Sequence, residues 1–135
     1  MPAEIILGVA RVESHFNGRA TSRLVDGVRV TGIWASTKPA GQGPRYCGVM
    51  QTIADHDWSE CLRQRDLAIG YAKGADELRR WMKLTRGNLR AALDGHACGW
   101  HGVQHHCNGY STRVMAYAKR LGWIAPSPAG GQRTR

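Results

Sequence analysis

Glu13 is the residue whose type and position first indicate chemistry in this chain. Apolar residues recur at helical spacing through residues 3–16, which predicts an amphipathic helix, and Glu13 falls between Ile6 and Val9 inside its apolar stripe. Burial there disfavours the charged form of a carboxylic acid, and the negative end of the helix dipole acts in the same direction. An acid that keeps its proton near neutral pH can serve as a general acid. The alternative is a structural glutamate that pairs with an arginine or reaches solvent.

Short motifs in a fixed order accompany Glu13. They are residues 12–17 (VESHFN), 48–51 (GVMQ) and 110–114 (YSTRV). This order resembles the lytic transglycosylase and goose-type lysozyme superfamily, in which Glu-Ser-x-Phe ends a helix, Gly-(Leu/Val)-Met-Gln follows and Tyr-x-x-x-Val opens a later helix. The resemblance extends over residues 3–122. Each motif is weak alone, and the three in order on the expected elements are more specific.

The resemblance implies a role for each matched position. Glu13 looks like the catalytic acid and base, and Ser14 like the residue that closes the helix end beside the substrate. Met50 and Gln51 look like glycan contacts at the floor of a cleft, and Tyr110 like a tyrosine that contacts the catalytic glutamate or the sugar. The structural alternatives are that Met50 belongs to the core, that Gln51 caps a following helix, and that Tyr110 is a core residue with its hydroxyl at the surface.

The chain departs from the family pattern where the family has Tyr-Asn-Ala-Gly. Residues 96–99 read HACG here, so His96 or His101 would replace the usual polar sugar contact, with an exposed loop histidine as the alternative. The second carboxylate of goose-type hydrolases has no clear match, and the candidates are Asp26 and Asp55.

Reaction type follows from the number of carboxylates. A glycosidase that uses water normally needs two, whereas the resemblance implies that a lytic transglycosylase needs only Glu13. We therefore expect cleavage between N-acetylmuramic acid and N-acetylglucosamine with formation of a 1,6-anhydro sugar, and hydrolysis as a muramidase is the alternative. Trp34 and Trp100 are the tryptophans expected to stack on sugars, whereas Trp81 and Trp123 follow helical spacing and are expected in the core.

The elements that must position these residues are mostly helices. The fold class expected is α+β, mainly α-helical and lysozyme-like, with a small β-hairpin beside the substrate cleft. An Asp26-Gly27 turn predicts the hairpin over residues 24–34. Residues 1–124 are expected to form one domain, and residues 125–135 a flexible basic tail or linker. The helices expected after the hairpin cover residues 48–54, 57–64, 66–86, 88–94 and 110–121, with an irregular segment over 95–109.

The four cysteines are Cys47, Cys61, Cys98 and Cys107. Their even count and paired spacing favour disulfides, with Cys47–Cys61 and Cys98–Cys107 as one of three possible pairings. Free thiols and a zinc site with the nearby histidines are the alternatives, although the tight C-x-x-C spacing typical of zinc fingers is missing. No metal and no cofactor is expected.

A net charge of +9 and a pI near 10.0 favour a polyanionic partner. The candidates are peptidoglycan strands and the anionic bacterial envelope, or nucleic acid held by basic residues on and after the long helix. A noncatalytic wall-binding module is a further alternative. We expect a monomer that acts at the bacterial wall without a membrane span. The N-terminus lacks a clear signal peptide, which fits a phage endolysin or virion-associated lysin, export by another route, or a domain of a longer protein.

Overall fold

Helices dominate the chain. The computed structural model describes residues 1–25, 28–33, 45–54 and 58–126. Over these residues the helices are α1 (Ala3–Ser14), α2 (Trp58–Arg63), α3 (Leu67–Leu84), α4 (Leu89–His105) and α5 (Tyr110–Arg120). The strands are β1 (Ala20–Val25), β2 (Val28–Ile33), β3 (Arg45–Cys47) and β4 (Thr52–Ile53). The structure is therefore α+β and mainly α-helical, as the sequence predicts.

The strands form one small antiparallel sheet in the order β2-β1-β3-β4. Val25 on β1 lies opposite Val28 on β2, so the chain reverses through the two residues between them. The predicted hairpin is therefore confirmed. Its two turn residues, including Asp26, lie outside the described residues.

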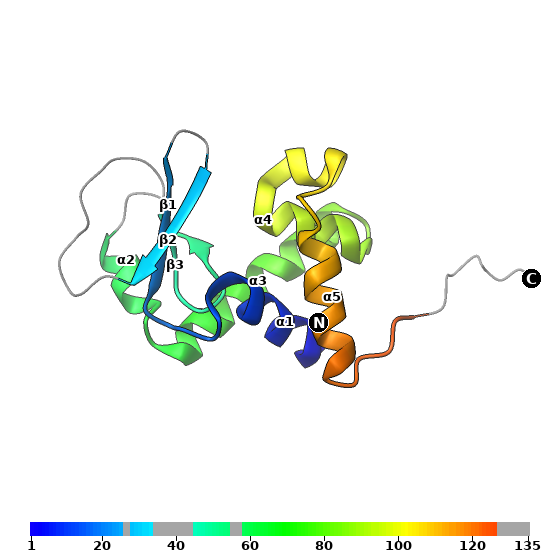
Figure 1. Ribbon diagram of the computed structural model, residues 1–135, viewed down its shortest axis with the longest axis horizontal. Coiled ribbons are helices and arrows are strands. Elements are labelled where there is room, and N and C mark those ends of the chain that lie inside the picture. The colour runs from blue at the N-terminus through cyan, green and yellow to red at the C-terminus, as the bar shows by residue number, and fades with distance from the viewer. Residues whose placement is uncertain (26–27, 34–44, 55–57, 127–135) are drawn as a thin grey trace, which may run out of the picture.

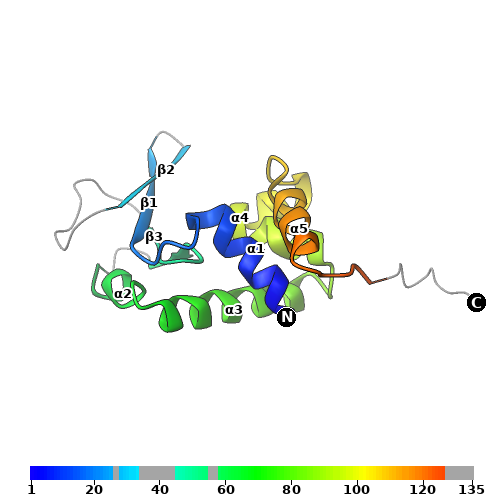
Figure 2. The same cartoon turned by 60° about the horizontal axis from the view of Figure 1, so that its bottom comes forward.

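The sheet and the C-terminal helices occupy opposite ends of the molecule. Figures 1 and 2 show the strands gathered at one end, with α4 and α5 at the other. Helix α3 runs lengthwise beneath both groups (Figure 2) and contacts both α4 and β4. This long helix therefore links the two ends of the molecule.

The core lies where α1 packs against α5. Ile5 and Val9 from α1 and Val114 and Ala118 from α5 are fully buried in it. Gly8 allows the two helices to approach closely, because a Cβ atom at this position would lie 2.7 Å from the carbonyl oxygen of Val114. This packing fixes the direction in which the last turn of α1, with Glu13, points.

Two predicted elements are wrong. Residues 48–54 do not form a helix, because Gly48 (φ 81°) and Gln51 (φ 50°) adopt left-handed conformations that turn the chain into β4. Residues 95–109 are not irregular throughout either. Helix α4 continues to His105 and is interrupted only at Gly99, whose φ of 63° and ψ of −156° bend its last part away from the axis.

Two disulfides stabilise these irregular places. Cys47 pairs with Cys61 and joins β3 to α2, and Cys98 pairs with Cys107 and closes the bent end of α4. This is the pairing named in the sequence analysis as one of the three possible ones. Within the described part of the chain, no helix has the length and apolar character needed to cross a membrane.

Candidate functional site

A cleft of about 830 Å³ lies between the sheet and the helices. Side chains from α1, α3, α4 and α5 line it, together with residues of β3 and β4. Both ends of the molecule therefore contribute to its walls. Its polar and charged lining residues are Glu13, Tyr46, Gln51, Glu77, Arg80, His96, His101, Asn108, Tyr110 and Arg113.

Glu13 stands at the wall of this cleft with little access to solvent. Its side chain is only 4% exposed. The hydroxyl of Tyr110 donates a hydrogen bond of 2.7 Å to Glu13 Oε2, and Nε2 of His96 lies 3.5 Å from the same oxygen. A carboxyl group held by a neutral and an ionisable donor in a water-poor site has a fixed orientation, which proton transfer to a bound substrate requires.

His96 is fully buried between acceptors. Its Nε2 lies 3.0 Å from the carbonyl oxygen of Met50, and its Nδ1 lies 2.5 Å from Glu77 Oε1. Burial lowers the pKa of His96, but the contact with Glu77, the charges of Glu77 and Glu13 and the Met50 carbonyl together raise it above its usual value. The prediction that residue 96 lies on a loop is therefore wrong, because α4 carries its side chain into the protein.

Close packing of α4 on α3 brings His96 to Glu77. Gly95 faces the ring of Trp81, and a Cβ atom at residue 95 would lie 2.6 Å from that ring. Since no larger side chain fits between the two helices there, the backbone of α4 reaches α3 directly. The adjacent His96 then spans the remaining distance from α3 to Glu13 on α1.

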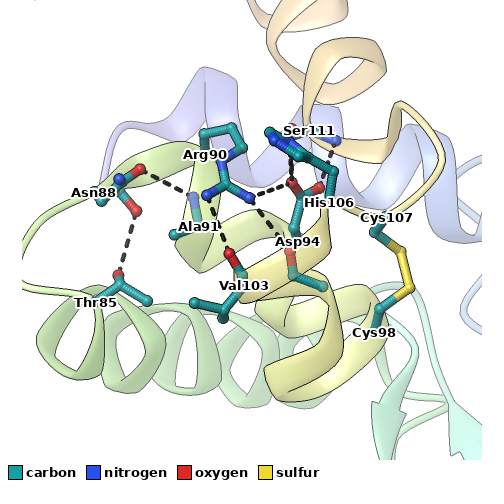
Figure 3. Close-up of polar contacts among 11 residues, drawn as sticks. Thr85, Asn88, Arg90, Ala91, Asp94, Cys98, Val103, His106, Cys107 and Ser111 are labelled. Carbon is teal, nitrogen blue, oxygen red and sulfur yellow. Dashed lines mark hydrogen bonds and ion pairs between the residues drawn. A yellow bond between two sulfur atoms is a disulfide. The ribbon is translucent and has the colours of Figure 1, made fainter.

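A polar cluster around Asp94 fixes the start of α5 (Figure 3). The Asp94 carboxylate is 1% exposed and lies 3.0 Å from Nη1 of Arg90. It accepts hydrogen bonds from the backbone N–H of Ser111 (3.2 Å) and from the Ser111 hydroxyl (3.3 Å). Gly109, the residue before α5, has no side chain to cap the helix, so Asp94 satisfies one of its free N–H groups from α4. Tyr110 lies between Gly109 and Ser111, and the cluster therefore determines where its hydroxyl points.

Ser14 and Gln51 act mainly on the backbone. The Ser14 hydroxyl donates to the carbonyl of Val49 at 2.8 Å and accepts from the N–H of Asn17, so it closes α1 as expected and does not line the cleft. Gln51 lines the cleft, but its side chain is buried and its Nε2 donates to the carbonyls of Ala20 and Gly48, both at 2.9 Å. Its amide nitrogen thus holds the turn before β4.

The remaining expectations meet different outcomes. Met50 is fully buried in the core, where its side chain packs against Gly74, so its assignment as a glycan contact is corrected. His101 lines the cleft and is exposed.

Trp100 is 52% exposed but lies outside the cleft lining, with its ring edge-on to Trp81 at 5.2 Å. Trp81 is buried as expected and also lines the cleft. Trp34 and Asp55, like Asp26, lie outside the described residues.

Glu77 is the functional candidate that the sequence analysis missed. Its side chain is 17% exposed and lines the cleft. It falls on the buried stripe of α3 that includes Gly74, Leu78 and Trp81, so the helical-wheel argument applied to Glu13 applies to it as well. Gly70 and Gly74 on that stripe carry no apolar side chain, so the apolar pattern around Glu77 was not recognised in the sequence. Among the described residues, no three His, Cys, Asp or Glu side chains are grouped to hold a metal ion.

Comparison with known proteins adds no family to this geometry. No protein-family model matches the chain, and neither the search of curated proteins nor that of solved structures finds a match. The functional argument therefore depends on the site itself.

Proposed function

We propose that this chain is a peptidoglycan-degrading enzyme with a lysozyme-like arrangement, and that it acts as a lytic transglycosylase with Glu13 as its acid and base. The observation that carries the proposal is the environment of the Glu13 carboxyl group. The side chain is nearly buried, it lies at the wall of the cleft, and it accepts a hydrogen bond of 2.7 Å from the Tyr110 hydroxyl. The motif order supports the same conclusion, since each of the three motifs contributes a residue to this cleft, namely Glu13, Gln51 and Tyr110.

The proposed reaction needs one group that first gives and then takes a proton. Glu13 donates its proton to the oxygen between N-acetylmuramic acid and N-acetylglucosamine, and the glycosidic bond breaks. The acetamido group of the substrate supports the positive charge at the sugar carbon. Glu13, now a carboxylate, takes the proton of the muramoyl 6-hydroxyl as that oxygen bonds to the same carbon. The product is a 1,6-anhydro sugar, and no water is consumed.

Hydrolysis by a muramidase is the second candidate, and Glu77 is the observation that favours it. Glu77 is a second carboxylate in the same cleft, which a water-activating base requires. Its Oε1 is however 2.5 Å from Nδ1 of His96, and a carboxylate committed to an imidazole is a poorer base for water. We therefore rank the transglycosylase first. Asp26 and Asp55 remain the sequence-based candidates for the same role.

The charge of the protein fits a substrate in the bacterial envelope. The net charge of +9 favours anionic partners, and Arg80 and Arg113 bring cations to the cleft itself. We infer that the protein acts at the cell wall, whether it is phage-delivered, exported or part of a longer chain.

The test is the release of soluble fragments from purified peptidoglycan by wild type and by Glu13→Gln, with mass analysis of the products. We expect products one water molecule lighter than those of hydrolysis, and a loss of about 100-fold or more in the variant. Glu4→Gln is the matched control, because it makes the same change on the same helix outside the cleft. Products of hydrolytic mass would identify a muramidase. Equal activity of Glu13→Gln and wild type would refute the role of Glu13, and salt-sensitive DNA binding without cleavage would favour the nucleic-acid alternative.

A further inference from the structure

The two ring nitrogens of His96 both face oxygen acceptors. A carbonyl oxygen can only accept, so Nε2, at 3.0 Å from Met50 O, carries a hydrogen. Nδ1 lies 2.5 Å from Glu77 Oε1 in a geometry that is not that of a hydrogen bond, and an unprotonated nitrogen and a carboxylate oxygen would repel at this distance. The arrangement therefore fits a doubly protonated imidazolium paired with the Glu77 carboxylate.

His96 is the member of the pair that faces Glu13. Nε2, at the positive end, lies 3.5 Å from Glu13 Oε2, while Glu77 contacts the opposite nitrogen. The His96 side chain is fully buried and that of Glu13 nearly so, which limits screening by water. A positive charge at this place stabilises a carboxylate on Glu13 more than it stabilises the neutral acid.

We propose that Glu77 and His96 form a positioning pair for the reaction, in which the imidazolium of His96 stabilises the carboxylate left on Glu13 when its proton moves to the glycosidic oxygen. No proton leaves His96 in this step. The inference rests on the proposed function, because it assigns the pair a part in the same proton transfer. It also gives Glu77 a use other than the activation of water.

Charged and titratable groups surround His96 from three other elements. Glu13 faces it from α1, Glu77 from α3, and Tyr110 from α5 at a ring separation of 6.5 Å. The other ionisable groups lining the described cleft are Tyr46, Arg80, His101 and Arg113. Glu77 is the partner whose close contact and charge do most to raise the pKa of His96 against the effect of burial. Its removal should therefore let His96 lose its proton at lower pH, and activity that needs the imidazolium should be lost at lower pH as well.

The experiment compares wild type, Glu77→Gln and Asp76→Asn on purified peptidoglycan across a pH series. Asp76→Asn is the matched control, because it removes one negative charge from the neighbouring position of α3, where Asp76 is 72% exposed and pairs with Arg79. We expect Glu77→Gln to move the alkaline limb of the kcat profile down by about one pH unit or more, with KM changing less. The control should keep the wild-type profile. His96→Gln should lower kcat by about tenfold or more and remove the dependence on this titration.

Nitrogen NMR of the six histidine rings separates this inference from the proposed function, since it does not depend on activity. Wild-type His96 should be doubly protonated at neutral pH, and the ring in Glu77→Gln should be neutral. A neutral wild-type ring would overturn the inference even if Glu77→Gln failed to fold. An unchanged pH profile in a folded Glu77→Gln would overturn it as well, with the proposed function intact. Absence of glycan cleavage by wild type would refute the proposed function and, with it, the role of the pair.

Discussion

Tyr110→Phe is the sharpest test of how Glu13 is held. The variant removes one hydroxyl and with it the 2.7 Å hydrogen bond to Glu13 Oε2, while the ring, which is 5% exposed, keeps its packing. A hydrogen bond to a charged group contributes about 1.5–3 kcal/mol, and since each 1.36 kcal/mol is a factor of ten in rate, we expect kcat to fall by about 10- to 150-fold. The assay is the initial rate of fragment release from purified peptidoglycan, with thermal unfolding measured on the same samples.

The matched control is Tyr117→Phe, which makes the same chemical change two turns further along α5. Tyr117 packs beside Phe16 and under the guanidinium groups of Arg11 and Arg120, outside the cleft lining. Its activity should stay within about twofold of wild type, since ordinary surface changes have small effects. If Tyr110→Phe were as active as this control at the same melting temperature, the hydrogen bond would have no part in the reaction and the argument from the site geometry would fail.

Two further predictions concern stability. Asp94→Ala should lower the free energy of unfolding by about 3 kcal/mol, because it leaves the Arg90 guanidinium without its carboxylate partner and an N–H of α5 without an acceptor. The exposed control Asp76→Ala should cost less than about 1 kcal/mol in the same urea titration. The pH dependence of stability should reveal His96. Because its pKa is raised in the folded state above the usual 6.5, its contribution is complete below that pH and is lost as the pH rises through the folded value. Wild type should therefore lose more free energy of unfolding than His96→Gln between neutral and alkaline pH. If denaturant titrations gave both proteins the same dependence of this free energy on pH, the assignment would be contradicted.

The sequence predicted the regular elements where a single local pattern decided the structure. Helices α1, α3 and α5 end within a few residues of their predicted bounds, because their apolar periodicity and their packing agree. The predicted end of α1 was less accurate. His15, with φ of 52°, adopts the left-handed conformation that ends the helix at Ser14, before the predicted end at residue 16. The N–H of His15 still bonds back to Arg11 and that of Phe16 to Ala10, so the backbone rather than the residue type fixes this end.

The irregular elements depended on contacts that no local pattern contains. The left-handed Gln51 is held by its own side chain, which reaches Ala20 across 31 residues, and a helical pattern over residues 48–54 could not reveal this. Likewise, the Gly, His and Cys composition of residues 95–109 is typical of a loop. Packing of Gly95 on Trp81 and the Cys98–Cys107 disulfide nevertheless keep it helical on both sides of the bend.

The candidate site shows the same division between local and distant information. Glu13 and Tyr110 were identified from their motifs, although 97 residues separate them and only the fold brings them into contact. His96 was named as a polar sugar contact, with an exposed loop histidine as the alternative, and the structure places it buried on α4 at the cleft wall. Glu77 was missed because the glycines of α3 hid the stripe on which it lies, and its contact with His96 is visible only in the fold. A buried carboxylate on a helix stripe is a recognisable signal, but the partner that makes it functional lies on another helix.

The groups around Glu13 bear on the choice between the two reactions. Tyr110 donates a hydrogen bond to Oε2, and Nε2 of His96, which carries a hydrogen, lies close to the same oxygen. Donors in these positions stabilise the carboxylate that forms when Glu13 gives up its proton. A hydrolase that activates water with Glu77 would instead need to withdraw Glu77 from His96, which would remove the charge that supports Glu13. The geometry of the pair thus favours the reaction in which Glu77 stays where it is.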